Sequence, residues 1–144
     1  MQKTLAYTFR MFPYKDELPF KKVSVFGKLN NDIKNFCNEI LTTKPDRIVG
    51  FAESMEKFST VERYAINQFN QHKRILSVAP DIYELNVPVE LTKLFQVRTT
   101  PTTSFCNLSM LKIMHFLKEN NLNIPFTFIH VSQNDLKKCQ NIFN

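Results

Sequence analysis

The sequence predicts a single α/β domain, a three-layer α/β/α sandwich around a mixed, largely parallel sheet. Segments with strand character alternate with segments of helical periodicity, as they do in layered α/β domains. The stretch Pro125–Val131 is apolar apart from Thr127 and His130, which is typical of a central strand buried on both faces. A chain of 144 residues can bury one core, so we assign residues 1–144 to one domain.

Short apolar runs rich in β-branched and aromatic residues mark the expected strands. These are Leu5–Phe9, Val23–Phe26, Arg47–Phe51, Val97–Thr100 and Pro125–Val131. The polar segment that follows Phe51, as far as Thr60, is expected to be a loop.

Apolar residues at helical spacing mark the expected helices. These run from a cap at Asn30 or Asn31 to Leu41, from about Pro88 to Leu94, from about Ser104 to Glu119, and from Leu136 to Phe143. Ser132, followed three residues later by Asp135, predicts a capping box ahead of the last helix.

The composition excludes two classes of binding site. Gly27 and Gly50 are the only 2 glycines and stand far apart, which excludes a glycine-rich phosphate-binding loop. Lys+Arg residues number 19 against 13 Asp+Glu, a formal net charge of +6, but the basic residues are dispersed and form no RNA-recognition signature. We therefore expect no nucleic-acid partner.

The sequence also predicts a cytoplasmic protein with no membrane partner. It contains no run of the ~20 apolar residues that a membrane span needs, and its first residues do not resemble a secretory signal. Cys37, Cys106 and Cys139 are odd in number and form no CxxC pair, so we expect free thiols, no metal site and no cofactor.

Cys106 and His130 are the residues best suited to chemistry. A thiol in the first turn of a helix faces unpaired backbone N–H groups and the positive end of the helix dipole, which favour the reactive thiolate. His130 ends an apolar strand, where α/β sheets present functional side chains, and Glu62 could orient an imidazole. His72 and His115 are weaker candidates. The alternative is that Cys106 is a small buried apolar residue and that His130 is structural.

Three stretches place these residues in the order glutamate, cysteine, histidine: Val61-Glu-Arg-Tyr-Ala-Ile-Asn67, Ser104-Phe-Cys-Asn107 and Phe128-Ile-His-Val131. They resemble, in the same order, the glutamate, nucleophile and histidine motifs of the pyroglutamyl peptidases, the pyrrolidone-carboxylate cysteine peptidases. The resemblance implies that Cys106 is the nucleophile, His130 its base and then its acid, and Glu62 the group that orients His130.

The same resemblance implies an apolar pocket for the N-terminal residue of a substrate. Phe9 and Phe12 keep the spacing of the family's N-terminal loop, and Phe105 precedes the nucleophile. Phe51 stands where the family carries a glutamine that reads the lactam, so we expect it to be a fourth, apolar wall. The family's first long helix is also missing here, because only about Lys15 to Phe20 joins the N-terminal loop to the next strand.

Two functions from different classes remain at this stage. The first is a shortened, divergent cysteine peptidase that removes a pyroglutamyl or similar small cyclic or apolar N-terminal residue from peptides with a blocked or small N-terminus. The second is a non-catalytic binding or regulatory domain on the same scaffold. The resemblance also allows a homo-oligomer.

Overall fold

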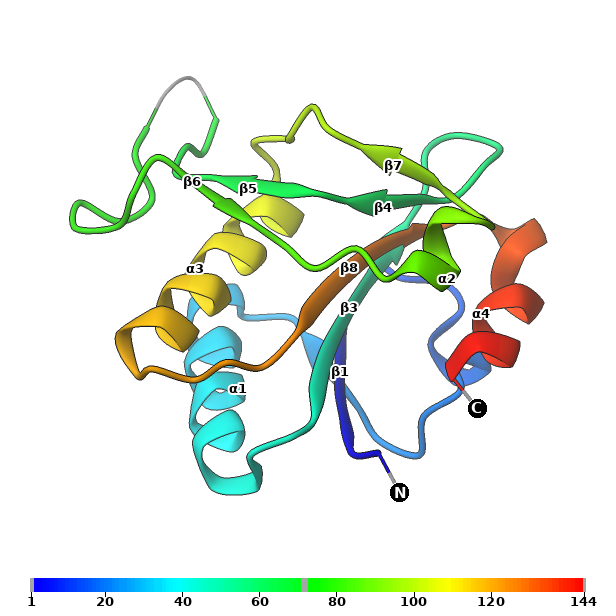
Figure 1. The fold of residues 1–144 in the computed structure, drawn as a ribbon, viewed down its shortest axis with the longest axis horizontal. Coiled ribbons are helices and arrows are strands. Elements are labelled where there is room, and N and C mark those ends of the chain that lie inside the picture. Colours follow the sequence, from blue (N-terminus) through cyan, green and yellow to red (C-terminus); the bar gives the residue numbers. More distant parts are fainter. Residues whose placement is uncertain (1, 71–72, 144) are drawn as a thin grey trace.

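A six-stranded sheet forms the centre of the fold, with strand order β2-β1-β3-β8-β4-β7 (Figure 1). The computed structural model describes residues 2–70 and 73–143. The strands are β1 (Thr4–Phe9), β2 (Val23–Phe26), β3 (Arg47–Glu53), β4 (Thr60–Glu62), β7 (Gln96–Arg98) and β8 (Phe126–Val131). Strands β2, β1, β3 and β8 run parallel, whereas β4 is antiparallel to β8 and carries β7 in parallel with itself. The prediction of a mixed, largely parallel sheet is confirmed.

Helices cover both faces of this sheet, as the predicted sandwich requires (Figure 1). The helices α1 (Leu29–Thr43) and α3 (Phe105–Glu119) pack on one face, over a core that includes Tyr7, Phe36 and Phe128. The helices α2 (Val89–Thr92) and α4 (Leu136–Phe143) cover the other face, over a second core that includes Phe51 and Ile129. Among the described residues, no helix has the length and apolar character to cross a membrane.

A small second sheet, which the sequence pattern did not predict, continues from β4. Its strands β5 (Tyr64–Ile66) and β6 (Ile82–Glu84) are antiparallel and extend beyond the central sheet in Figure 1. The backbone oxygen of Arg63 accepts from Leu85 N at 2.7 Å, which closes the base of this hairpin. We call this hairpin, together with the end of β4 that leads into it, the β5 arm. The β5 arm therefore contains both Glu62 and the strand β5 that meets α3.

The predicted start of one helix and the predicted end of another are wrong. Helix α1 begins at Leu29. The carboxylate of Asp32, in the first turn of the helix, accepts hydrogen bonds from the backbone N–H groups of Gly27 and Lys28 at 2.7 and 2.9 Å, so these two residues before the helix have partners. Helix α2 is also shorter than expected, at Val89–Thr92.

The predicted capping box at Ser132 and Asp135 does not form. A 3₁₀ turn, Gln133–Asp135, precedes α4, and Ser132 makes no side-chain cap hydrogen bond. The Asp135 carboxylate instead accepts from Ser59 Oγ at 2.7 Å and from Ser132 Oγ at 3.1 Å. Asp135 thus ties the loop before β4 to the end of β8, a long-range contact that a local motif cannot reveal.

Gly50 allows two aromatic side chains to close over the middle of β3. It lies between Tyr7 and Phe128 in the strand register, and a Cβ added to it would lie 2.6 Å from a Phe128 ring carbon and 2.7 Å from a Tyr7 ring carbon. Any side chain here would push these rings apart, and both rings belong to a tightly packed core.

We predict that Gly50→Ala destabilises the protein by about 1–3 kcal/mol, the usual effect of overpacking a core. Gly27→Ala is the matched control, because a Cβ there meets only the end of the exposed, flexible Arg10 side chain. Its effect should stay within about 0.5 kcal/mol. Urea denaturation of both variants measures the difference, and equal stabilities would contradict this account of Gly50.

Candidate active site

Cys106 lies in the first turn of α3, as the sequence predicted. Ser104 is the N-cap residue, but its side chain makes no cap hydrogen bond, and its hydroxyl pairs with Thr102 Oγ1 at 2.9 Å. The first N–H groups of a helix have no intrahelical acceptor, so the backbone amides around Cys106 can face a negatively charged group. The local backbone therefore favours a thiolate and an oxyanion at the same place.

Asn107 fixes this first turn to the β5 arm. Its side chain is fully buried, and its Oδ1 accepts from Ile66 N at 2.8 Å. Its Nδ2 donates to the backbone oxygens of Ile66 at 2.9 Å and Gln68 at 3.1 Å. The amide thus pairs with β5 as a neighbouring strand would, which sets the position of Cys106 relative to β4 and Glu62.

A second polar chain fixes the same turn to the central sheet. Ser109 Oγ donates to the backbone oxygen of Cys106 at 2.7 Å and shares a 2.8 Å hydrogen bond with the Tyr7 hydroxyl. Both side chains have no exposed surface, and burial raises the pKa of Tyr7 well above its ordinary value, so Tyr7 remains neutral. Helix α3 is therefore attached near Cys106 to both sheets.

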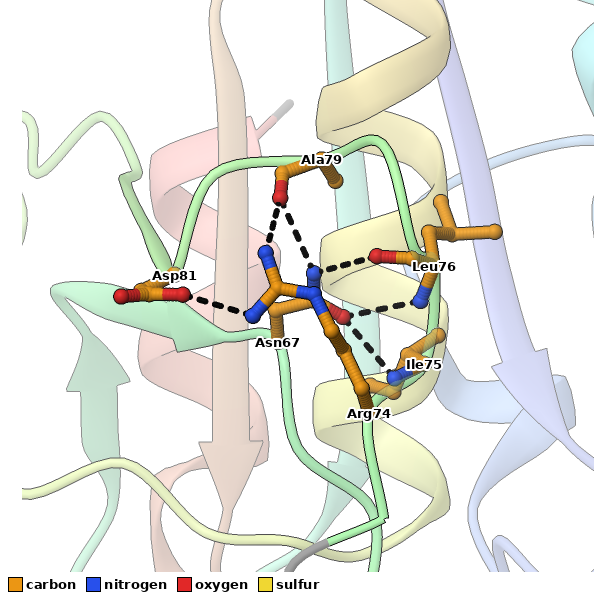
Figure 2. Close-up of polar contacts among 6 residues, drawn as sticks. All are labelled: Asn67, Arg74, Ile75, Leu76, Ala79 and Asp81. Carbon is orange, nitrogen blue, oxygen red and sulfur yellow. Dashed lines mark hydrogen bonds and ion pairs between the residues drawn. The ribbon is translucent and has the colours of Figure 1, made fainter.

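Asn67 makes hydrogen bonds within the β5 arm, to which Asn107 is also hydrogen-bonded (Figure 2). Its Oδ1 accepts from the backbone N–H groups of Ile75 and Leu76, both at 2.9 Å, and its Nδ2 donates to the backbone oxygens of Leu76 at 2.6 Å and Ala79 at 3.2 Å. Arg74 adds contacts to Ala79 and to Asp81, the latter at 2.7 Å. One asparagine thus closes the loop between β5 and β6.

His130 and Glu62 meet on the face of the sheet that α3 covers. Thr60 of β4 lies directly opposite His130 of β8, and Glu62, two residues further along β4, points to the same face. The Glu62 Oε1 atom is 3.2 Å from His130 Nδ1, and the two side chains are 1% and 13% exposed. The contact has the distance of an ion pair, although the N–H direction is poorly aligned for a hydrogen bond.

His130 is held in its cationic form by its neighbours. Burial, the largest single effect, lowers its pKa, but polar interaction with Cys106 and Glu62 and the charges of these two groups together outweigh burial and raise the pKa of His130 to about 9. Because Nδ1 faces Glu62, Nε2 is the nitrogen left for Cys106. Glu62 and Cys106 thus both act on His130, and a cationic imidazole beside a thiol favours the thiolate.

A mainly apolar cavity of about 460 Å³ opens beside Cys106. Phe9, Phe12 and Phe105 line it together with Cys106, so three of the four expected aromatic walls belong to this cavity. Phe51 does not. It has no exposed surface and packs against Phe20 and Phe143 in the core beneath α4. The expectation that Phe51 is a pocket wall is therefore wrong.

The strand alternation explains the position of Phe51. Successive residues of a strand point to opposite faces, so when Phe51 faces α4, Ala52 faces α3. Ala52 pairs with His130 in the register and lines the cavity in its place.

The other two histidines are not part of this site. His115 lies further along α3, where its Nδ1 is 2.8 Å from the Tyr83 hydroxyl and its Nε2 is 2.9 Å from Glu119. It joins α3 to β6. His72 lies outside the described residues.

Sequence reasoning missed the residues that hold the nucleophile in place. Asn107 and Ser109 sit on the buried side of a helix, where apolar residues are expected, and both are fully buried. Buried polar side chains need hydrogen-bond partners. The signal in the sequence was the presence of two polar residues at positions of the helix that are expected to be buried.

The fold and the site define a class of protein: a layered α/β domain with a helix-N-terminal cysteine, a histidine and a buried glutamate that contacts this histidine. Comparison with solved structures gives the fold a more specific identity. Pyrrolidone carboxyl peptidase from Thermococcus litoralis aligns with a TM-score of 0.71 and 21% identity, over 92% of this chain and 77% of that one. Pyroglutamyl peptidase I from Bacillus amyloliquefaciens aligns with a TM-score of 0.70 and 19% identity, over 92% and 82%.

A mutant pyrrolidone carboxyl peptidase from Pyrococcus furiosus has a TM-score of 0.73 at 18% identity, over 90% of this chain and 80% of that one. Sequence searches found no matching family model and no matching curated protein. The chain therefore has the fold of the pyrrolidone carboxyl peptidases, at low sequence identity.

We predict that Cys106 reacts much faster with iodoacetamide near neutral pH than the other two cysteines. All three thiols are free, but burial raises the pKa of Cys37 and of Cys139 to about 12, which suppresses their thiolates. Mass-spectrometric peptide mapping after brief treatment measures the labelling, with Cys106→Ser as control. Equal labelling of the three, or preferential labelling of Cys37, would contradict the assignment.

Proposed function

We propose that this chain is a cysteine peptidase of the pyroglutamyl-peptidase type, which cleaves the amide bond after a pyroglutamyl or similar small cyclic or apolar N-terminal residue of a peptide. The observation that carries the proposal is the position of His130, between the buried Glu62 carboxylate and a Cys106 thiol at a helix N-terminus. The shared fold of the pyrrolidone carboxyl peptidases supports it.

In the first half of the reaction, the Cys106 thiolate attacks the amide carbonyl carbon and a C–S bond forms. The carbonyl oxygen takes up the negative charge, and the backbone N–H groups of the first turn of α3 stabilise it. The C–N bond then breaks as the His130 imidazolium gives its proton to the leaving amine. The products are the shortened peptide and a thioester on Cys106.

In the second half, water hydrolyses the thioester. His130, now neutral, takes a proton from the attacking water, the C–S bond breaks, and the acid leaves. The thiolate and the imidazolium are restored. Glu62 takes no proton in this scheme; it stabilises the imidazolium in both halves of the cycle and holds its Nδ1 side.

We also propose the cytosol as the compartment of this protein. The reaction needs a reduced Cys106, and a reducing compartment maintains free thiols. The three cysteines of the chain are all free.

The direct test is a comparison of kcat/KM on pyroglutamyl, prolyl and alanyl coumarylamides, with Cys106→Ala as the blank. We expect cleavage that depends on Cys106 and is fastest for the pyroglutamyl or another small apolar N-terminal group. If folded protein with reduced Cys106 cleaves no acyl amide above the blank, the peptidase proposal fails and the non-catalytic binding domain takes its place.

We predict that Glu62→Gln lowers kcat/KM about a hundredfold or more, because the imidazolium loses its buried partner. The pKa of His130 is raised from 6.5 to about 9, so its protonation stabilises the folded protein fully below pH 6.5 and this contribution is lost as pH rises through about 9. The rate should fall over the same upper range, because the leaving amine needs the proton.

In Glu62→Gln, the alkaline fall in rate should move to lower pH, while the circular dichroism spectrum remains that of the wild type. Glu90→Gln is the control, because Glu90 is exposed on α2, on the other face of the sheet, and does not line the cavity. An unchanged pH profile in Glu62→Gln, or an unfolded variant, would show that Glu62 is only structural.

A further inference from the structure

The cavity beside Cys106 is larger than a five-membered lactam requires. An apolar cavity of about 150 Å³ is enough to hold a six-membered ring such as benzene. The cavity here measures about 460 Å³, which falls in the range of about 300–1,000 Å³ typical of sites for larger organic ligands. A small ring would leave much of this space unfilled.

The walls of the cavity are poorly suited to the polar edge of a lactam. Phe9, Phe12, Phe26 and Leu29 supply apolar surface. The polar side chains in the lining are Arg10, Glu53 and Ser104, all exposed, and the Ser104 hydroxyl is already paired with Thr102. Phe51, at the position of the family's lactam-reading glutamine, faces the opposite side of the sheet. An apolar group gives up no hydrogen bonds when it enters such a site, whereas a lactam amide gives up its hydrogen bonds to water without replacing them, which weakens its binding.

Two large apolar side chains remain exposed at the mouth of the cavity. Met11 is 86% exposed and Phe105 is 60% exposed, whereas Phe12, which also lines the cavity, is 2% exposed. A small ring fits against the buried part of the lining, which includes Phe12, Phe26 and Ala52. A larger apolar group that extends to the mouth would also remove the surfaces of Met11 and Phe105 from water, which favours its binding.

We propose that this cavity selects a bulky apolar N-terminal acyl group, such as an N-acylated aromatic residue, in preference to a pyroglutamyl ring. The inference rests on the proposed peptidase function and names its substrate class. Met11 and Phe105 are the specificity-determining residues, because the larger group covers more of their exposed apolar surface. The reaction is unchanged, with the acyl group transferred to Cys106 and then to water.

The test compares kcat/KM for N-acetylphenylalanyl coumarylamide and pyroglutamyl coumarylamide. We expect the first to exceed the second by about tenfold or more. Phe105→Ala and Met11→Ala should each lower kcat/KM more for the larger substrate than for the pyroglutamyl substrate, so that the ratio of the two values falls about fivefold or more. Val89→Ala is the matched control, because Val89 is 65% exposed on α2, on the other face of the sheet.

The outcomes separate this inference from the peptidase proposal. Faster cleavage of the pyroglutamyl substrate, or equal losses on both substrates in Phe105→Ala and Met11→Ala, overturns the inference and leaves the peptidase intact. If neither substrate is cleaved, the peptidase proposal fails, and binding to Cys106→Ala decides the inference by NMR titration. Tighter binding of N-acetylphenylalaninamide than of pyroglutamamide supports the apolar cavity, and the reverse order overturns it.

Discussion

The arrangement of the candidate site depends on one buried carboxylate. The Glu62 side chain is 1% exposed and meets the His130 imidazole at 3.2 Å. A buried charge without a partner is strongly destabilising, so an ionised Glu62 requires a cation beside it. His130 supplies that cation, and the raised pKa of its imidazole follows from Glu62 and Cys106 together. The fold thus holds a carboxyl group and an imidazole together at a buried position, an arrangement that is frequent at functional sites.

The topology of the sheet brings this pair to the nucleophile. Strand β4 runs antiparallel to β8, and its residue Thr60 lies opposite His130. Glu62 therefore lies two residues further from the carboxyl end of β8 than Thr60 does, on the face of the sheet that α3 covers. The chain then continues directly into β5, and Asn107 binds that strand through three hydrogen bonds. The same arm therefore orients the histidine through Glu62 and positions Cys106 through Asn107. A displacement of the arm would alter both ends of the site together.

The elements that sequence reasoning predicted are those with strong local patterns. The last helix, Leu136–Phe143, has the predicted bounds, and β1, β3, β8 and α3 lie within two residues of theirs. Strands β4, β5 and β6 have three residues each, and long-range pairing stabilises them. The error at Phe51 has another cause, because a strand that is apolar on both faces gives no sign of which residues point to which side. The hydrogen bonds of Asn107 and Ser109 span 41 and 102 positions, beyond any local motif.

The charge state of His130 tests the central claim most directly. Nitrogen-15 NMR of the ring distinguishes an imidazolium from either neutral tautomer, and Cys106→Ala and Glu62→Gln identify the contributions of its two neighbours. Because the pKa of His130 is about 9, the account predicts that both ring nitrogens carry protons at pH 7.5 in the wild-type protein. In each variant the imidazolium should lose its proton at lower pH. A neutral His130 at pH 7.5 in the folded wild-type protein would contradict the account.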